Sequence, residues 1–153
     1  MSKRGKHPSG PSVPISPEER YRSLFDNAGE GIYQSSVSGR ILNINPALAT
    51  LFGYRSPEEM KRNIKNAYRQ IYADRKQREK VMREVEARGH AQYEFRFLRR
   101  DKSQGWGFTS MHAVRNAQGE TAYYEGFFVD ITERKRMEEK LREAHDLLEK
   151  RVV

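Results

Sequence analysis

The sequence predicts an α+β domain in which a five-stranded antiparallel sheet carries short helices on one face and is flanked by N- and C-terminal helices. Aromatic and polar residues alternate through residues 92–97, as they do in a half-buried antiparallel strand. Ser16-Pro17, Asn45-Pro46 and Ser56-Pro57 each place a capping side chain before a proline, a pattern typical of helix starts. The strand patterns and helix starts form separate blocks of the chain, which favours the α+β class.

Five strands are expected, in two groups. They cover residues 31–37, 40–44, 92–97, 106–114 and 121–129. A tight turn at Ser38-Gly39 joins the first two strands into a hairpin. Turns at residues 101–103 and 116–119 connect the last three. The predicted order is therefore helix, two strands, several helices, three strands and helix.

Four helical segments precede the last three strands, and a fifth follows the last strand. The N-terminal helix begins after Ser16 and carries Tyr21, Leu24 and Phe25 on one face, at the spacing of an amphipathic helix. Short helices follow Asn45 and Ser56, and a longer one begins with a cap at Asp74 and ends at Gly89. The buried stripe of this longer helix is expected to be Val81, Met82 and Val85.

The composition restricts the class of protein. A chain of 153 residues fits one domain with flanking segments. Its net charge of +8 does not predict a nucleic-acid surface, because acidic residues are mixed among the basic ones. The absence of cysteine excludes disulfides and thiolate chemistry and fits a reducing compartment. No apolar stretch approaches the roughly 20 residues of a membrane span, so a cytoplasmic protein is expected, with residues 1–15 as a disordered leader.

Three stretches of the sequence resemble the PAS domain family. GIYQSSVSGRILNINPALATLFGY is similar to the opening hairpin and the helix that follows it. YEFRFLRRDKSQGW is similar to the third strand and its turn, and HAVRNAQGETAYYEGFFVDITERKRMEEKL to the last hairpin and exit helix. The resemblance implies a PAS domain at residues 16–131, followed at residues 132–153 by a helical linker with a seam for a short coiled coil.

The resemblance also implies a function. PAS domains sense a small ligand or a partner and pass the signal through the exit helix to an effector such as a histidine kinase or a diguanylate cyclase. The chain is therefore expected to be a signal-sensing, homodimeric module of a bacterial-type signal transduction protein, and not an enzyme. The alternative is a protein–protein interaction adaptor whose core is filled and binds nothing.

Alternation and the resemblance to PAS strands together predict a ligand pocket between the sheet and the helices. The expected pocket residues are Ile32, Ile44, Leu48, Leu51, Val81, Val85, Phe95, Phe97, Thr109, Met111 and Phe128. The alternative interpretation is that these side chains simply fill the core. Thr109 is the main polar member, so an apolar small molecule, or no ligand, suits the set better than a polar ligand.

The exit helix is the expected output element. Thr132 is predicted to cap this helix, while Asp130 ties the last strand to the helix start. Both residues are assigned to signal coupling. An apolar seam at heptad spacing then follows and is assigned to dimerisation and output, although it is short enough to pack on its own domain instead. The seam consists of Met137, Leu141, Ala144 and Leu148.

Cofactor binding is not supported by the residues present. The light-sensing PAS members need a cysteine, and where they carry amide side chains this chain aligns Phe97, Gly107 and Phe128, so photochemical flavin binding is not expected. Haem is not expected either, because residues 74–89 contain no histidine. The four histidines are too scattered to predict a metal site, and no catalytic motif occurs.

The outer face of the sheet is expected to need a cover. Trp106, Phe108 and His112 are predicted to lie there, in phase with Tyr124 or nearby residues. Exposed aromatic residues on a sheet are usually covered. The N-terminal helix, from the same chain or from a dimer mate, is the nearest candidate.

Overall fold

The chain folds as an α+β domain built on one antiparallel sheet, which confirms the predicted class. The computed structural model describes residues 15–152, so nearly all of the predicted leader lies outside the described residues. The strand order in the sheet is β2-β1-β5-β4-β3. The strands are β1 (Gly31–Ser35), β2 (Ile41–Ile44), β3 (His90–Leu98), β4 (Gln104–Arg115) and β5 (Thr121–Asp130). The helices are α1 (Pro17–Asn27), α2 (Pro46–Leu51), α3 (Pro57–Asn63), α4 (Ala67–Gln70), α5 (Arg75–Arg88) and α6 (Thr132–Lys150).

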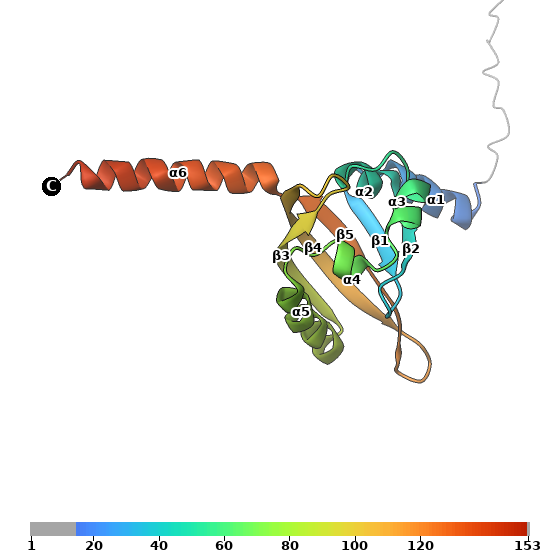
Figure 1. Cartoon of the computed structure of the whole chain (residues 1–153). Coiled ribbons are helices and arrows are strands. Elements are labelled where there is room, and N and C mark those ends of the chain that lie inside the picture. Colours follow the sequence, from blue (N-terminus) through green and yellow to red (C-terminus); the bar gives the residue numbers. More distant parts are fainter. Residues whose placement is uncertain (1–14, 153) are drawn as a thin grey trace, which may run out of the picture.

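Helices α2, α3, α4 and α5 lie on one side of the sheet (Figure 1). Helix α2 packs against β1, and α5 packs against β3 and β4. Helix α1 contacts α2 at one end of the domain. Helix α6 begins beside β4 and then projects away from the sheet (Figure 1). The domain therefore has a compact two-layer body and one helix that leaves it.

The predicted helix caps at Ser16, Asn45 and Ser56 are confirmed. The side-chain oxygen of Ser16 accepts a hydrogen bond from the Glu19 amide at 3.1 Å, and that of Ser56 accepts one from the Glu59 amide at 3.1 Å. Asn45 caps α2 in the same way through the Leu48 amide. These side chains satisfy backbone amides that a helix start leaves without partners.

Asn45 does more than cap one helix. Its side chain is fully buried, accepts a hydrogen bond from the Ile32 amide at 2.9 Å, and donates to the carbonyls of Phe25 and Glu30 at 3.1 and 2.9 Å. One amide group thus joins the end of α1, the start of β1 and the start of α2. The cap-proline pattern predicts the helix start but not these longer-range bonds.

Helix α4 is an element that the sequence analysis did not predict separately. It is a single turn, and the Asn66 side chain accepts hydrogen bonds from the amides of Tyr68 and Arg69. One turn is too short to show helical periodicity. Its importance lies in what it buries, because Ala67 and Tyr68 both face the core.

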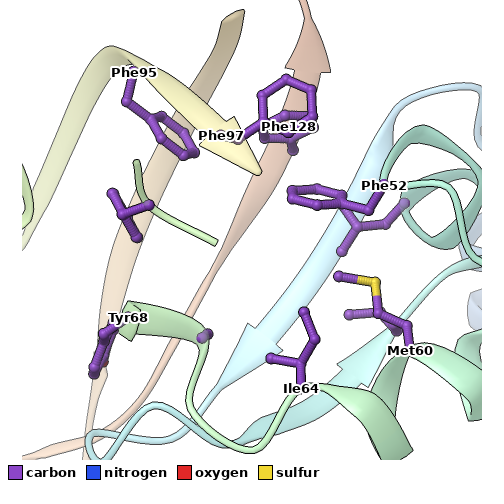
Figure 2. Packing of buried hydrophobic residues seen from close by; sticks show 11 residues of the cluster. Phe52, Met60, Ile64, Tyr68, Phe95, Phe97 and Phe128 are labelled. Atoms are coloured by element: carbon purple, nitrogen blue, oxygen red, sulfur yellow. The ribbon is translucent and has the colours of Figure 1, made fainter. Parts of the chain in front are cut away.

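The core beneath the helices forms two neighbouring clusters. In the first, Phe52, directly after α2, packs against Phe97 of β3 and Phe128 of β5, with ring centroids 5.0 and 4.9 Å apart. Figure 2 shows Met60 of α3 and Ile64, directly after it, on the same side of the cluster as Phe52, with the Phe97 and Phe128 rings on the sheet side. The second cluster lies under α5 and contains Val81, Val85, Ala91, Met111 and Tyr124. The predicted buried stripe of α5 is thereby confirmed for Val81 and Val85.

Candidate functional site

A cavity of about 70 Å³ lies within the first cluster, between the sheet and helices α2 to α4. Side chains of the sheet form one wall, and side chains of the helices and their connections form the other. The lining residues are Tyr33, Gln34, Ser35, Ile41, Ile44, Leu48, Phe52, Met60, Ala67, Tyr68, Ile71, Tyr72, Tyr93, Phe95, Thr109, Met111 and Phe128. The cavity wall thus joins both layers of the domain.

The structure brings six of the eleven predicted pocket residues to this cavity. They are Ile44, Leu48, Phe95, Thr109, Met111 and Phe128. Phe97 belongs to the same core cluster but does not line the cavity, and Leu51 packs against that cluster. Val81 and Val85 belong to the second cluster instead. Helix α5 is therefore next to the cavity and not part of its wall.

The prediction that Ile32 faces the pocket is wrong. Ile32 pairs with Phe127 of β5, whose ring contacts Phe108 of β4 on the outer face. The next residue, Tyr33, points inward and reaches Thr109 with its hydroxyl group. Both residues are large and partly buried, so β1 has no alternation in hydrophobicity from which the inward side can be read.

The prediction that Tyr124 shares the outer face with Trp106 is also wrong. Tyr124 is 3% exposed, lies in the second core cluster, and donates a hydrogen bond to Glu86 of α5 at 2.7 Å. In the register of β4 and β5, Tyr124 is paired with Ala113, one residue beyond His112. That one-residue difference reverses the face because side chains alternate along a strand.

Four tyrosines in the cavity wall were not predicted as site residues. Tyr33, Tyr68, Tyr72 and Tyr93 come from β1, α4, the segment after α4 and β3. The Tyr72 and Tyr93 hydroxyl groups are hydrogen-bonded to each other. Alternation along residues 92–97 places Tyr93 on the inner face, but Tyr68 and Tyr72 lie where the sequence carries no periodic signal. The wall is thus richer in hydroxyl groups than Thr109 alone suggests.

These tyrosines are neutral at physiological pH. Burial raises the pKa of Tyr72 to about 12, and burial also raises the pKa of Tyr33 and of Tyr93 well above the ordinary value of 10.0. Among the described residues, no Asp, Glu, Lys, Arg or His side chain lines the cavity. The cavity therefore offers hydroxyl groups and aromatic or aliphatic surface, and no charge.

A second set of contacts joins the sheet to α6. The Asp130 carboxylate accepts a hydrogen bond from the Thr132 amide at 2.9 Å, while the Thr132 hydroxyl oxygen accepts one from the Trp106 amide at 3.0 Å. Arg99 lies 3.5 Å from the other Asp130 oxygen. The predicted cap at Thr132 is wrong, because Thr132 is the first residue of the helix and the cap position is Ile131, whose side chain makes no capping hydrogen bond. The Asp130 carboxylate accepts the hydrogen bond from the first helical amide instead. We call Arg99, Trp106, Asp130 and Thr132 the helix joint.

The first turn of α6 is held by a further ion pair. Glu94 of β3 contacts both Arg134 and Lys135 of α6, with the Lys135 ammonium group at 2.5 Å. The same ammonium group lies 5.0 Å from the centre of the Trp106 ring. Hydrogen bonds from these two basic side chains lower the pKa of Glu94, and the bond from Lys135 has the largest effect. The start of α6 is thus attached to β3 and β4.

The rest of α6 has no such support. None of its described residues is buried. Met137, Leu141 and Leu148 of the predicted seam are 63%, 74% and 64% exposed. Ala144 is exposed as well. The seam does not pack on its own domain.

Metal and histidine chemistry find little support in the fold. His90 and His112 stack with each other on the exposed face. His145, Asp146 and Glu149 lie close together but are fully exposed on α6, and such groups are common without an ion. Within residues 15–152, no helix combines the length and apolar character that crossing a membrane requires.

Comparison with known proteins identifies the family. A family model described as PAS domain matches residues 29–133. The chain belongs to the PAS domain family. No curated protein matches it. PAS domains are in general sensory modules without catalytic activity, and the family model spans all five strands of the sheet.

Solved PAS structures share its fold. The PAS domain of a protein from Colwellia psychrerythraea aligns at 23% identity and a TM-score of 0.68, covering 77% of this chain and 99% of that one. A sensory box histidine kinase/response regulator from Burkholderia thailandensis aligns at 22% identity and 0.65, covering 86% and 99%. A PAS domain in complex with ethanol, from a LuxR-family transcriptional regulator of Burkholderia thailandensis, aligns at 18% and 0.57, covering 72% and 96%.

Proposed function

We propose that this PAS domain is the signal-sensing and dimerising module of a bacterial-type signal transduction protein. Residues 16–131 act as the sensing unit, and residues 132–153 act as the helical linker to an effector such as a histidine kinase or a diguanylate cyclase. The observation that carries the proposal is the cavity of about 70 Å³, because its wall is shared by the sheet and by helices α2 to α4. A ligand there contacts both layers and favours one arrangement of them.

The path from cavity to α6 is short. Phe128 lines the cavity. Asp130, two residues further along β5, accepts a hydrogen bond from the first amide of α6. On β4, Thr109 lines the cavity and Trp106 bonds to Thr132. A shift of β4 against β5 therefore acts directly on the helix joint. In this proposal Asp130 and Thr132 couple the ligand to the output helix.

Dimerisation is assigned to α6. Met137, Leu141, Ala144 and Leu148 lie at heptad spacing and are exposed along the helix. Exposed apolar side chains in such a stripe are buried when two helices associate in parallel. In the dimer, a movement at the helix joint changes how the two α6 helices pack against each other.

The size of the cavity favours a small ligand. A dry cavity of about 150 Å³ accommodates benzene, and this cavity is about 70 Å³. A flavin or haem ring system does not fit unless the wall rearranges. A structural neighbour whose PAS domain was solved in complex with ethanol supports a ligand of this scale. We therefore propose that the cavity binds a small organic molecule and that the domain has no resident cofactor.

Thermal unfolding against a library of small metabolites tests the sensing function. A ligand present at about 100 times its dissociation constant stabilises the folded state by about 2.7 kcal/mol. Ala67→Met fills the cavity from α4, and Ala122→Met places the same side chain on an exposed position of β5. Ligands that stabilise the wild type and Ala122→Met, but not Ala67→Met, support the proposal.

Light scattering and hydrogen exchange complete the test. Truncating residues 137–153 should abolish the dimer, and a ligand should change amide exchange at the start of α6. Both results together support signal transfer from the cavity to α6. If no compound distinguishes wild type from Ala67→Met while the protein remains a dimer, the sensing function is wrong and the adaptor function replaces it.

A further inference from the structure

The tyrosine and threonine hydroxyl groups of the cavity wall do not balance as donors and acceptors. Thr109 donates its only proton to the Phe127 carbonyl at 2.9 Å. Tyr33, 2.7 Å from the Thr109 oxygen, must therefore donate to it. The Tyr68 hydroxyl donates to the carbonyls of Ser36 and Val37, both at 3.3 Å. The protons of these three hydroxyl groups are all used within the protein.

Tyr72 and Tyr93 differ from them. Their hydroxyl groups are bonded to each other, and no other hydrogen-bond partner for either one is found within residues 15–152. Each hydroxyl group carries one proton, so one of the two protons serves the pair and the other has no acceptor. Tyr72 is only 7% exposed, and a buried donor without an acceptor is costly. The unused proton belongs to a group that lines the cavity.

The rest of the wall determines what kind of acceptor fits. A charged ligand is disfavoured, because no ionised side chain lines the cavity among the described residues and a buried charge needs a partner. A purely apolar ligand leaves the surplus proton without an acceptor. The remaining class is a neutral molecule with an exposed oxygen, and the cavity volume restricts it to a few heavy atoms.

We infer that the cavity binds a neutral molecule of about four heavy atoms whose carbonyl or hydroxyl oxygen accepts the surplus proton of the Tyr72–Tyr93 pair. A short-chain ketone or alcohol has this chemistry. The inference rests on the proposed sensing function and names the ligand class for it. Tyr72 and Tyr93 are then the residues that select the ligand, while the aromatic and aliphatic wall supplies contact area.

Three molecules of similar shape separate the alternatives. Acetone carries the neutral acceptor, isobutene replaces its oxygen with a methylene group, and acetate replaces one methyl group with a charged oxygen. Methyl NMR of the methionine side chains follows their binding, because Met60 and Met111 line the cavity whereas Met137 is exposed on α6. We expect acetone to shift the Met60 and Met111 signals saturably, and acetate to leave them unchanged.

Tyrosine variants then test the surplus proton itself. The double variant Tyr72→Phe/Tyr93→Phe removes both protons, and we expect it to weaken acetone binding at least about fivefold without weakening isobutene binding. Each single variant, Tyr72→Phe or Tyr93→Phe, still leaves one hydroxyl group with an unused proton. Acetone binding by either single variant should stay within about twofold of wild type. Tyr124→Phe is the matched control, since this buried hydroxyl group bonds to Glu86 and lies outside the cavity wall.

The unfolding temperature of the double variant shows whether that variant is still folded. Because both hydroxyl groups of the pair are removed together, no buried partner is left behind, and the unfolding temperature should be equal to or above that of wild type. Equal loss of acetone and isobutene binding in the double variant overturns the inference. Equal binding of acetone by wild type and double variant also overturns it, and in that case the sensing function survives with an apolar ligand. Failure of both acetone and isobutene to reach Met60 and Met111 overturns the inference, whereas the sensing function is decided separately by the unfolding test with the metabolite library.

Discussion

The body of the domain and helix α6 are held in opposite ways. In the body, Phe97, Met60 and Val85 are fully buried, and the helices lie against the sheet. In α6 none of the described residues is buried, and its contacts with the body are concentrated in the first turn. Hydrophobic burial therefore fixes the sensing unit, whereas a few polar contacts fix the direction in which α6 leaves it. Small changes in the body can redirect the helix without unfolding either part.

The largest expected effect comes from emptying the core at Phe128. Phe128→Ala should lower the free energy of unfolding by about 3–5 kcal/mol, because its ring packs against Phe52, Phe95 and Phe97. Chemical denaturation measures the loss. Phe127→Ala is the control, since this neighbouring ring is 38% exposed on the outer face. Similar losses for the two variants would contradict the inward placement of Phe128.

A smaller but still large effect is expected at Asn45. Asn45→Ala should cost about 3 kcal/mol, more than an ordinary cap, because it leaves buried groups of α1, β1 and α2 without partners. Urea denaturation of this variant can be compared with Asn63→Ala, whose exposed side chain bonds only to the Glu59 carbonyl. A cost for Asn45→Ala no greater than that for Asn63→Ala would mean that Asn45 acts as a simple cap.

The contacts that fix α6 should contribute much less. Glu94→Gln should lower the free energy of unfolding by less than about 1 kcal/mol, as expected for a partly exposed ion pair, and should speed amide exchange in the first turn of α6. Because the folded protein lowers the pKa of Glu94, its contribution is present above the ordinary value of 4.5 and is lost as the pH falls through the lowered pKa.

The pH dependence distinguishes this role from a general charge effect. Glu139→Gln removes a carboxylate that pairs only with Arg142 of the same helix. We expect it to leave the acid dependence of exchange at the start of α6 unchanged. Identical acid profiles for wild type and Glu94→Gln would show that Glu94 does not hold the helix.

The smallest effect on folding is expected in the seam itself. Leu141→Ala should change the free energy of monomer unfolding by less than about 0.5 kcal/mol, because the side chain is 74% exposed. In the proposed dimer the same side chain is buried, and its truncation should weaken association about tenfold or more. Sedimentation measures this, with Leu147→Ala beside the seam as control. Equal dimer affinities for the two variants would place the interface elsewhere.

Much of the fold could be predicted because its signals are local. Alternation through residues 92–97 and the capping pattern at Ser16, Asn45 and Ser56 depend on near neighbours in the sequence, and all of them were found. Helix α4 was not predicted because one turn shows no period. Its Tyr68 therefore remained outside the expected site.

The cavity wall was harder to predict because it depends on pairing between distant strands. Ile32 and Tyr33 are both suited to burial, and only the register of β1 with β5 decides which one faces inward. The predicted cap at Thr132 is wrong for a similar reason, since the Thr132 hydroxyl oxygen accepts a hydrogen bond from the Trp106 amide of another strand. The hydroxyl pair of Tyr72 and Tyr93 likewise joins residues whose proximity no local pattern reveals.

Because α6 is long, a small tilt at the helix joint causes a large displacement at the far end of the helix. Its 19 residues extend about 28 Å at about 1.5 Å per residue. A tilt of about 10° at Thr132 therefore displaces the far end by about 5 Å, close to the pitch of one helical turn. A tilt of this size at the joint therefore displaces Lys150, and in the proposed function the effector beyond it, sideways by about 5 Å.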